Sequence, residues 1–499
     1  MPLAPRFALS AAATLAAVIV CSPAAQGLAS QSSGIRRDGD ARLDSAAVAR
    51  LLTQLGAVDS EVCELAGAAL NNWGNYRISP DHLPTPRPVP MPTPMPMPMM
   101  RASFERMRMP RIRWRWDRSD RNDPSLLAAY AGFVRAPSAC VRRIAARALA
   151  EDGSKATFNL FAGMLRDPDT GIRATGALGL AEQGDPHALT LLIGALKDQD
   201  AAVRREAALG LGDLADPAAL DPLKVVAKDQ SAGVRRVAVW ALAELSDSTA
   251  EPAIGTALAD ADSDVRAMAA WGAGQLGDGR AAGALQRAVS DPAPEVRANA
   301  VWALGQLQLQ SSVSALTPAL KDADAETRSL AAHALGEIQA AGAVTSLGAA
   351  LKDPAADVRR SAAWALGEIQ SATAVPALGA ALKDPDPGVR ETAAWSLGEI
   401  QDVNSVPWIT PALKDTARDV QVAAAWALGE IQSVKAIDAL KDAMGDPSGE
   451  VRRAAVWALS QIDDLRAEDA VLNAPQEDGG GPRRAARVHL RAPRPPTRP

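Results

Sequence analysis

An arginine recurs every 31 residues over most of this 499-residue chain. The column comprises Arg142, Arg173, Arg204, Arg235, Arg266, Arg297, Arg328, Arg359, Arg390 and Arg452, and Gln421 stands at the one departure. An aspartate lies six residues before each position from Arg173 onward, as Asp167, Asp198, Asp229, Asp260, Asp291, Asp322, Asp353, Asp384, Asp415 and Asp446. Such a fixed period is typical of a solenoid, because a single short unit cannot bury its own apolar face and must stack on the next.

Each repeat is predicted to be a helical hairpin. In residues 371–401, the segment 375–382 has apolar residues at helical spacing, with a proline near its start. The Pro- and Gly-containing segment 383–388 predicts a turn whose aspartate caps the next helix. That second helix is expected over 389–400, and its apolar stripe comprises Val389, Ala393, Ser396, Leu397 and Ile400. The sequence therefore predicts an all-α solenoid.

The D-x5-R and A-A-x-A-L-G-E-I motifs, over about residues 123–466, resemble the short HEAT-like repeats named after phycobilisome lyases. The resemblance implies a right-handed superhelix of about twelve 31-residue HEAT-like hairpins. It also implies that the Asp and Arg columns form a hydrogen-bonded ladder along the stack, including Asp198, Arg204, Asp291, Arg297, Asp353, Arg359, Asp384 and Arg390. We interpret this ladder as structural, because a catalytic acid–base pair is not needed ten times over.

The rest of the chain divides by composition. Residues 1–29 are predicted to be a signal peptide, followed by a disordered linker at 30–42 and a degenerate capping repeat at 43–73. Residues 74–122 form a Pro/Met/Arg-rich low-complexity insert, and 467–499 a disordered basic tail. We therefore expect a protein of the periplasm or a secreted protein, without a membrane span after signal cleavage. The alternative is a retained N-terminal anchor.

Two cysteines remain after removal of the predicted signal peptide, Cys63 and Cys140. Alignment of the capping repeat with the next unit puts Cys63 in the Arg column and Cys140 two positions before it. Because stacked helices lie ~8–10 Å apart, the thiols can meet near their helix starts. We predict a Cys63–Cys140 disulfide in an exported protein; the alternative is two separate buried thiols.

Charge is segregated along the chain. Residues 122–481 carry a net charge of −16, whereas 101–121 carry +5 and 482–499 carry +6. An acidic array repels phosphates, so we expect no nucleic acid to bind at the array.

One further column contains Trp240, Trp271, Trp302, His333, Trp364, Trp395, Trp426 and Trp457. On a helical wheel, Trp364 falls well away from the apolar stripe, so we expect these side chains to project from the second helix. The resemblance to HEAT-like stacks implies that this helix lines the concave face, so the side chains would line a groove. One turn later lies a polar column that includes Glu244, Glu337, Glu368, Glu399 and Glu430. The alternative is that the indoles pack flat across neighbouring helices.

The function predicted from these columns is a non-catalytic protein-binding scaffold in the cell envelope, which holds an extended or basic protein segment. The pattern is similar to the Trp-x3-Asn arrays of armadillo-type nuclear-import adaptors that clamp extended peptides. Indole faces stack on proline rings and cationic stems, and carboxylates pair with the cationic ends. The chain's own Pro/Met insert and Arg-Pro tail are alternative occupants.

Enzymatic functions find little support in the sequence. The repeat is similar to that of phycobilin lyases, yet nothing here defines a tetrapyrrole site. HEAT-like deoxyhypusine hydroxylases hold iron with His-Glu pairs, and none of the four histidines here precedes a glutamate. We expect no enzyme activity, no cofactor, no metal and a monomer. The alternative function is an accessory or lyase-like subunit that acts with a tetrapyrrole lyase or an envelope protease.

Overall fold

The computed structural model describes residues 45–55 and 124–473, and these are helical with no strand among them. They form an all-α solenoid, as predicted. The described residues fall into two compact units that divide between Ala257 and Leu258, and each unit is considered by itself.

The first unit begins with a single short helix and continues with hairpins. Its α-helices are α3 (Ser45–Leu55), α5 (Pro124–Phe133), α6 (Ala139–Ala150), α7 (Lys155–Met164), α8 (Thr170–Gln183), α9 (Leu189–Ala195), α10 (Ala201–Leu214), α11 (Leu220–Val226), α12 (Ala232–Glu244) and α13 (Glu251–Ala257). Short 3-10 helices, η3 (Pro186–Ala188), η4 (Pro217–Ala219) and η5 (Ser248–Ala250), precede α9, α11 and α13.

The second unit repeats the same hairpin. Its α-helices are α14 (Ser263–Leu276), α15 (Ala282–Ala288), α16 (Pro294–Gln306), α17 (Val313–Ala319), α18 (Ala325–Glu337), α19 (Val344–Ala350), α20 (Ala356–Ile369), α21 (Val375–Ala381), α22 (Pro387–Ile400), α23 (Val406–Ile409), α24 (Arg418–Ile431), α25 (Ile437–Ala443), α26 (Gly449–Gln461) and α27 (Leu465–Leu472). The 3-10 helices are η6 (Gly279–Ala281), η7 (Gln310–Ser312), η8 (Ala341–Ala343), η9 (Ala372–Ala374), η10 (Val403–Ser405), η11 (Thr410–Lys414) and η12 (Val434–Ala436).

Local sequence explains where each long helix begins and ends. Asp386 is the N-cap of α22, and its side chain accepts a hydrogen bond from the backbone N–H of Val389. Pro387 occupies the first turn, where a missing N–H costs nothing. The helix ends at Gln401, which adopts the left-handed conformation at φ 54°. The same left-handed position recurs in other repeats, occupied by glycine at Gly184 and Gly277.

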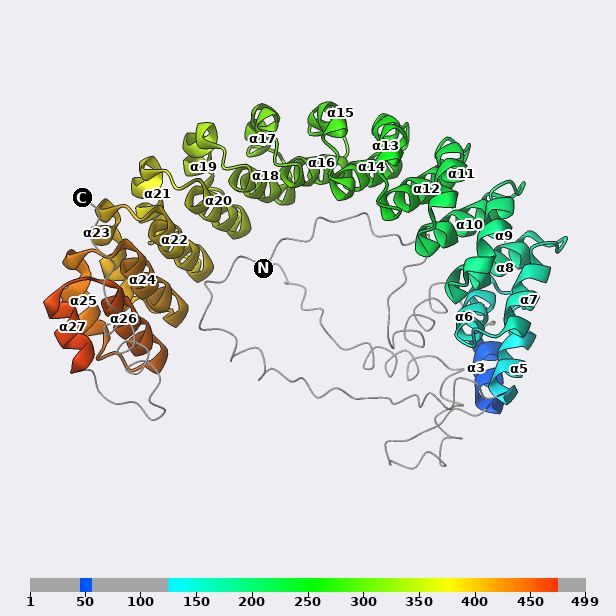
Figure 1. Cartoon of the computed structure of the whole chain (residues 1–499), viewed down its shortest axis with the longest axis horizontal. Coiled ribbons are helices and arrows are strands. Elements are labelled where there is room, and N and C mark those ends of the chain that lie inside the picture. The colour runs from blue at the N-terminus through cyan, green and yellow to red at the C-terminus, as the bar shows by residue number, and fades with distance from the viewer. Residues whose placement is uncertain (1–44, 56–123, 474–499) are drawn as a thin grey trace, which may run out of the picture. The chain divides into compact units, whose positions relative to one another are not determined.

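In the second unit the long, even-numbered helices α14 to α26 pack side by side in one row, and the short, odd-numbered helices pack on them. Figure 1 shows that the row of long helices lies on the inner side of the arc of this unit. Val358, Ala362 and Leu366 of α20 are fully buried. This stripe fits a core made of small and medium side chains, in which neighbouring helices approach closely.

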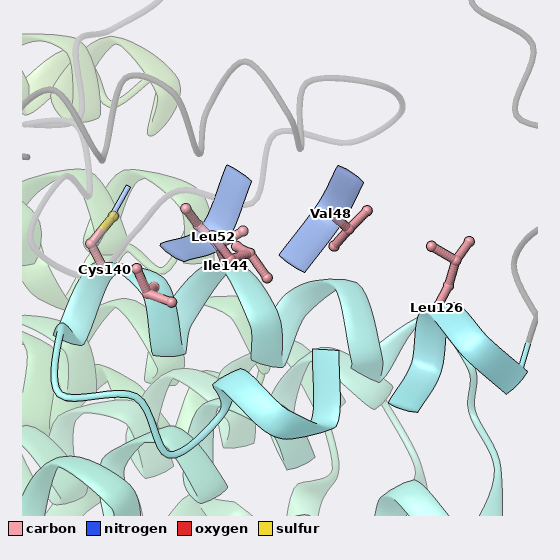
Figure 2. Packing of buried hydrophobic residues seen from close by; sticks show 6 residues of the cluster. Val48, Leu52, Leu126, Cys140 and Ile144 are labelled. Atoms are coloured by element: carbon pink, nitrogen blue, oxygen red, sulfur yellow. The ribbon is translucent and has the colours of Figure 1, made fainter. Parts of the chain in front are cut away.

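At the N-terminal end of the first unit, α3 packs on α5 and covers the first hairpin. Val48 and Leu52 of α3 are buried together with Leu126, Cys140 and Ile144, as Figure 2 shows. Cys140 is disulfide-bonded. Its partner lies outside the described residues, so the pairing with Cys63 stays a prediction.

At the other end, the prediction that the array stops at residue 466 is wrong. The chain continues as α27, which packs on α25 and α26 and buries Ala467, Ala470 and Val471. The helix lacks the 31-residue signature, because a terminal element needs an apolar stripe on one side only. The predicted tail therefore begins no earlier than the end of α27.

The predicted signal peptide, the linker at 30–42, the insert at 74–122 and most of the capping repeat lie outside the described residues. Among the helices that the structure describes, none is both long and apolar enough to cross a membrane.

Candidate functional site: the tryptophan column and the acidic row

The Asp/Arg ladder fixes the spacing between hairpins. Arg359 donates from Nε and Nη2 to the two carboxylate oxygens of Asp384 in the next repeat, at 2.7 and 2.8 Å. Its Nη1 donates to the carbonyl oxygens of Asp353 and Pro354 in its own loop, at 2.8 and 3.2 Å. The equivalent bidentate pairs are Arg173–Asp198, Arg204–Asp229, Arg266–Asp291, Arg297–Asp322, Arg328–Asp353 and Arg390–Asp415.

Ladder aspartates remain ionised because of these contacts. Burial by itself would raise the pKa of Asp384. Hydrogen bonds from Arg359 and from the backbone N–H of Asp386 outweigh that effect, so the pKa of Asp384 lies below its ordinary value. The Asp384 carboxylate thus links its own loop to the guanidinium of Arg359, which in turn holds the loop of the preceding repeat. These contacts assign the ladder a structural role.

The tryptophan column lies along the row of long helices, and five of its seven indoles, those of Trp240, Trp302, Trp364, Trp426 and Trp457, lie against a glycine 28 residues earlier. A Cβ atom at Gly336 would lie 2.7 Å from Cζ3 of Trp364. The same relationship holds in both units, for the pairs Gly212–Trp240, Gly274–Trp302, Gly398–Trp426 and Gly429–Trp457. The six-membered ring of each of these five indoles thus lies against the backbone of the preceding long helix.

This packing corrects the expectation of freely projecting indoles. Trp364 is only 6% exposed, so its faces are covered. The other column residues, Trp240, Trp271, Trp302, His333, Trp395, Trp426 and Trp457, are half-buried. The wheel places the indoles away from the core stripe, but the missing side chain of glycine lets each ring fold onto the neighbouring helix. The surface therefore presents ring edges and partial faces.

Two ring contacts run along the column in the second unit. The imidazole of His333 stacks on the indole of Trp364, with ring centroids 4.2 Å apart and planes inclined by 21°. The rings of Trp395 and Trp426 are nearly parallel, at 10°, with centroids 6.4 Å apart. The Nε1 atom of Trp364 is buried without a hydrogen-bond partner among the described residues.

Beside the column, the second unit carries four glutamates in consecutive repeats, which we call the acidic row: Glu337, Glu368, Glu399 and Glu430. All four are half-buried. Within the described part of the chain, Glu368, Glu399 and Glu430 have no hydrogen bond or ion pair. Glu337 accepts a hydrogen bond from Nε2 of Gln308 at 3.3 Å, and its Oε1 lies 3.4 Å from Nε2 of His333.

Two members of the acidic row, Glu368 and Glu399, have raised pKa values because they are partly buried and lie near like charges. Burial raises the pKa of Glu368, and the charges of Glu399 and Glu337 raise it further. Burial and the charge of Glu430 raise the pKa of Glu399. Burial likewise lowers the pKa of His333, and Glu337 offsets part of that effect. The row is therefore a line of carboxylates whose negative charge the surrounding protein leaves largely uncompensated.

One turn before the tryptophan column, Arg360 and Glu391 occupy the same position in consecutive repeats. Arg360 donates a hydrogen bond to Asp357 on its own helix. In the next repeat, burial and Asp419 raise the pKa of Glu391, whereas Arg360 lowers it. Arg360 is thus directed to carboxylates other than the acidic row.

The four glutamates of the acidic row lie in the second unit; in the first unit the same repeat position carries Glu182, which pairs with Arg147, and Asp213. In the first unit, Glu244 stands one turn after Trp240; burial raises its pKa, and a hydrogen bond from Trp240 lowers it in part. Leu178 and Leu209 take the place of tryptophan in the two preceding repeats.

The glycine column is the part of this site that sequence reasoning missed. A 28-residue offset between a glycine and the next tryptophan is nevertheless visible in most of these repeats. Among the described residues, no group of three or more His, Cys, Asp or Glu side chains is placed to hold a metal ion.

A family profile described as HEAT repeats matches residues 126–198, 159–232, 222–289, 281–361, 344–420 and 406–491. These matches cover most of the chain. The chain belongs to the HEAT-repeat family. A comparison with curated protein sequences finds no match.

Solved structures of other HEAT-repeat proteins resemble it. A chain in the structure of Kap95p with RanGDP is 15% identical, with a TM-score of 0.50, over 74% of this chain and 59% of that one. The CpcE–CpcF complex of phycocyanin lyase from a Nostoc species is 22% identical over 45% and 94% of the two chains, with a TM-score of 0.31. Human deoxyhypusine hydroxylase is 24% identical over 49% and 96%, with a TM-score of 0.24. At these identities the likenesses say nothing about ligands.

Proposed function

We propose that this HEAT-repeat protein is a non-catalytic scaffold that binds an extended, basic protein segment along the acidic row. The observation that carries the proposal is the repulsion among Glu337, Glu368, Glu399 and Glu430. Burial and, in addition, like-charged neighbours raise the pKa values of Glu368 and Glu399, so a cation placed between these carboxylates lowers the free energy of the site.

The chemistry favours arginine or lysine as the recognised group. A guanidinium can donate two parallel hydrogen bonds to one carboxylate, and its stem can lie on the exposed part of an indole. Because one glutamate occurs in each repeat, the ligand must present its cations at intervals of about one helix spacing, ~8–10 Å. An extended segment meets this requirement, whereas a compact basic patch does not.

The site is further proposed to work outside the cytoplasm, in the periplasm or after secretion, with the chain as a monomer. This placement rests on the signal-like sequence of residues 1–29 and on the oxidised state of Cys140. Amino-terminal sequencing of the mature protein from fractionated cells tests it, and a start at Met1 in the cytoplasmic fraction would contradict it. Sedimentation of the purified chain tests the monomer.

Binding is tested with a fluorescein-labelled peptide that carries arginine at every third or fourth position among prolines and alanines. We expect the E368Q/E399Q variant to bind it at least about tenfold more weakly than the wild type, and added salt to weaken binding in the wild type. The matched control is E295Q/E326Q, which removes the same charge from exposed first turns of α16 and α18. Equal affinity in E368Q/E399Q and in the control would contradict the proposal.

A basic partner that is itself an enzyme would make the protein an accessory subunit, which is the alternative function. The same peptide experiment bears on it. If the E368Q/E399Q variant still bound a candidate enzyme, the accessory role would not depend on the acidic row.

A further inference from the structure

The segment 482–499 carries arginines with an unusual spacing. Arg484, Arg487, Arg491, Arg494 and Arg498 follow one another at alternating intervals of three and four residues, in a segment with six arginines, five prolines and no acidic residue. The mean interval is 3.5 residues. In polyproline-like or extended chain, at about 3.1–3.3 Å per residue, this interval corresponds to about 11 Å.

That distance is close to the spacing of the acidic row. Glu337, Glu368, Glu399 and Glu430 occur once in each stacked repeat, on the adjacent helices α18, α20, α22 and α24. Adjacent packed helices lie about 8–10 Å apart. A chain with one arginine per 11 Å therefore presents one guanidinium to each glutamate with little adjustment of register.

The segment is also within reach of the row. Helix α27 ends at Leu472 and packs on α25 and α26 in the same unit as the row. Eleven residues, 473–483, separate this helix from the first arginine of the series. They span up to about 35 Å when extended. This exceeds the single helix spacing from α26 to α24, which carries Glu430, and also the two spacings of about 20 Å from α26 to α22, which carries Glu399.

We propose that residues 482–499 dock in cis along the acidic row, with their arginines opposite Glu430, Glu399, Glu368 and Glu337. The segment then competes with any other basic ligand, so the protein regulates its own binding surface. This inference rests on the proposed function, since it names the resident competitor for the same carboxylates. Segment 101–121 has a similar series, Arg108, Arg111, Arg115, Arg118 and Arg121, but it is a weaker candidate because Asp117 and Asp120 interrupt that series, whereas segment 482–499 has no acidic residue.

The inference is tested in the full chain with a labelled synthetic peptide of sequence 482–499. The R487Q/R491Q/R494Q variant removes three arginines of the series. A composition-matched variant, A485R/A486R/R487A/R491A, keeps every charge but gathers four arginines at 483–486. We expect the first variant to bind the peptide at least about tenfold more tightly than the wild type, and the second at least about threefold more tightly.

Each other result overturns a defined part of the reasoning. Equal, measurable affinity in the wild type and in R487Q/R491Q/R494Q would overturn docking in cis and leave the proposed function intact. Absence of peptide binding in R487Q/R491Q/R494Q would overturn both. If the composition-matched variant behaves as the wild type, charge alone acts and the register argument is wrong. Concentration-dependent self-association that is lost in R487Q/R491Q/R494Q would assign the segment to a second copy of the chain and contradict docking in cis.

Discussion

The six-membered ring of Trp364 lies against the α-carbon of Gly336 on the preceding long helix. A Cβ atom at that glycine would approach Cζ3 of the indole to 2.7 Å and Cα of Ala365 to 2.9 Å. Both distances are shorter than ordinary carbon contacts, so the pair requires glycine. Because the same offset recurs in other repeats, the tryptophan column and the glycine column form one packing device.

Gly336→Ala should therefore destabilise the fold although alanine is the better helix former. We expect a loss of about 1–3 kcal/mol in the free energy of unfolding, because the added methyl group pushes the indole off the helix. Gly348→Ala is the control: it lies in α19, where the nearest atom to a new Cβ is 3.8 Å away. It should gain about 0.5–1 kcal/mol. Denaturant unfolding of the two variants measures both, and equal effects would contradict the packing argument.

The repeat architecture could be predicted almost completely from the sequence. The Asp and Arg columns mark every loop, and the apolar stripe of the second helix marks the face that is buried. Both follow from local chemistry, since a capping aspartate and a helical period are properties of neighbouring residues. The 3-10 turns before the short helices and the extra helix α27 were missed, because neither carries the 31-residue signature.

The site was predictable in position but not in exposure. A helical wheel gives the direction of Trp364 relative to its own helix, yet says nothing about how close the next helix comes. That distance depends on Gly336, one repeat away. The acidic row followed from the column of glutamates. Its mutual repulsion could not be predicted, because it depends on burial and on the distance between helices.

Replacement of a ladder arginine by glutamine, the residue found at the natural gap Gln421, should weaken the Asp/Arg ladder. Arg359→Gln removes the bidentate contact to Asp384 and the bonds to two loop carbonyls. We expect a loss of about 2 kcal/mol in the free energy of unfolding. At the natural gap, Gln421 reaches Asp446 with a single bond of 3.4 Å, so Gln421→Arg should gain about 1 kcal/mol. Thermal and urea unfolding give both values; no gain from Q421R would contradict the ladder's energetic role.

The left-handed residues that end the long helices should tolerate glycine well. Gln370 adopts φ 52°, a conformation that costs a side-chain-bearing residue about 1 kcal/mol relative to glycine. Gln370→Gly should therefore raise the free energy of unfolding by roughly 0.5–1 kcal/mol. The reverse change at an equivalent position, Gly277→Ala at φ 65°, should lower it by a similar amount. Calorimetry on both variants tests this, and a loss in Q370G would contradict it.

The disulfide of Cys140 should have Cys63 as its partner. Peptide mapping of exported protein under non-reducing conditions is expected to yield a linked peptide that contains both residues and resolves on reduction. Cys140→Ser should loosen the packing of α3 on α5, seen as faster amide exchange at Val48 and Leu52, which are buried there. Two free thiols, or a link from Cys140 to Cys21, would contradict the pairing.

Removal of charge from the acidic row should stabilise the protein at neutral pH and have no effect in acid. The pKa values of Glu368 and Glu399 are raised in the folded state, so ionisation costs the folded chain more than the unfolded one. The cost is full above the folded-state pKa and disappears below the unfolded value of about 4.3.

E368Q/E399Q should accordingly gain about 1 kcal/mol at pH 7.5, a figure reduced for partial solvent screening, and nothing at about pH 4. The comparison is made in the R487Q/R491Q/R494Q background, so that these arginines of segment 482–499 cannot neutralise the row. Ladder aspartates such as Asp384 have lowered pKa values, which makes both proteins less stable in acid. Only the difference between variant and parent is therefore diagnostic. Urea unfolding over this pH range measures it, with E295Q/E326Q as control. A gain in the free energy of unfolding of the variant over its parent that grows as the pH falls would contradict the repulsion among the carboxylates of the row. The proposed recognition of a basic segment depends on that repulsion.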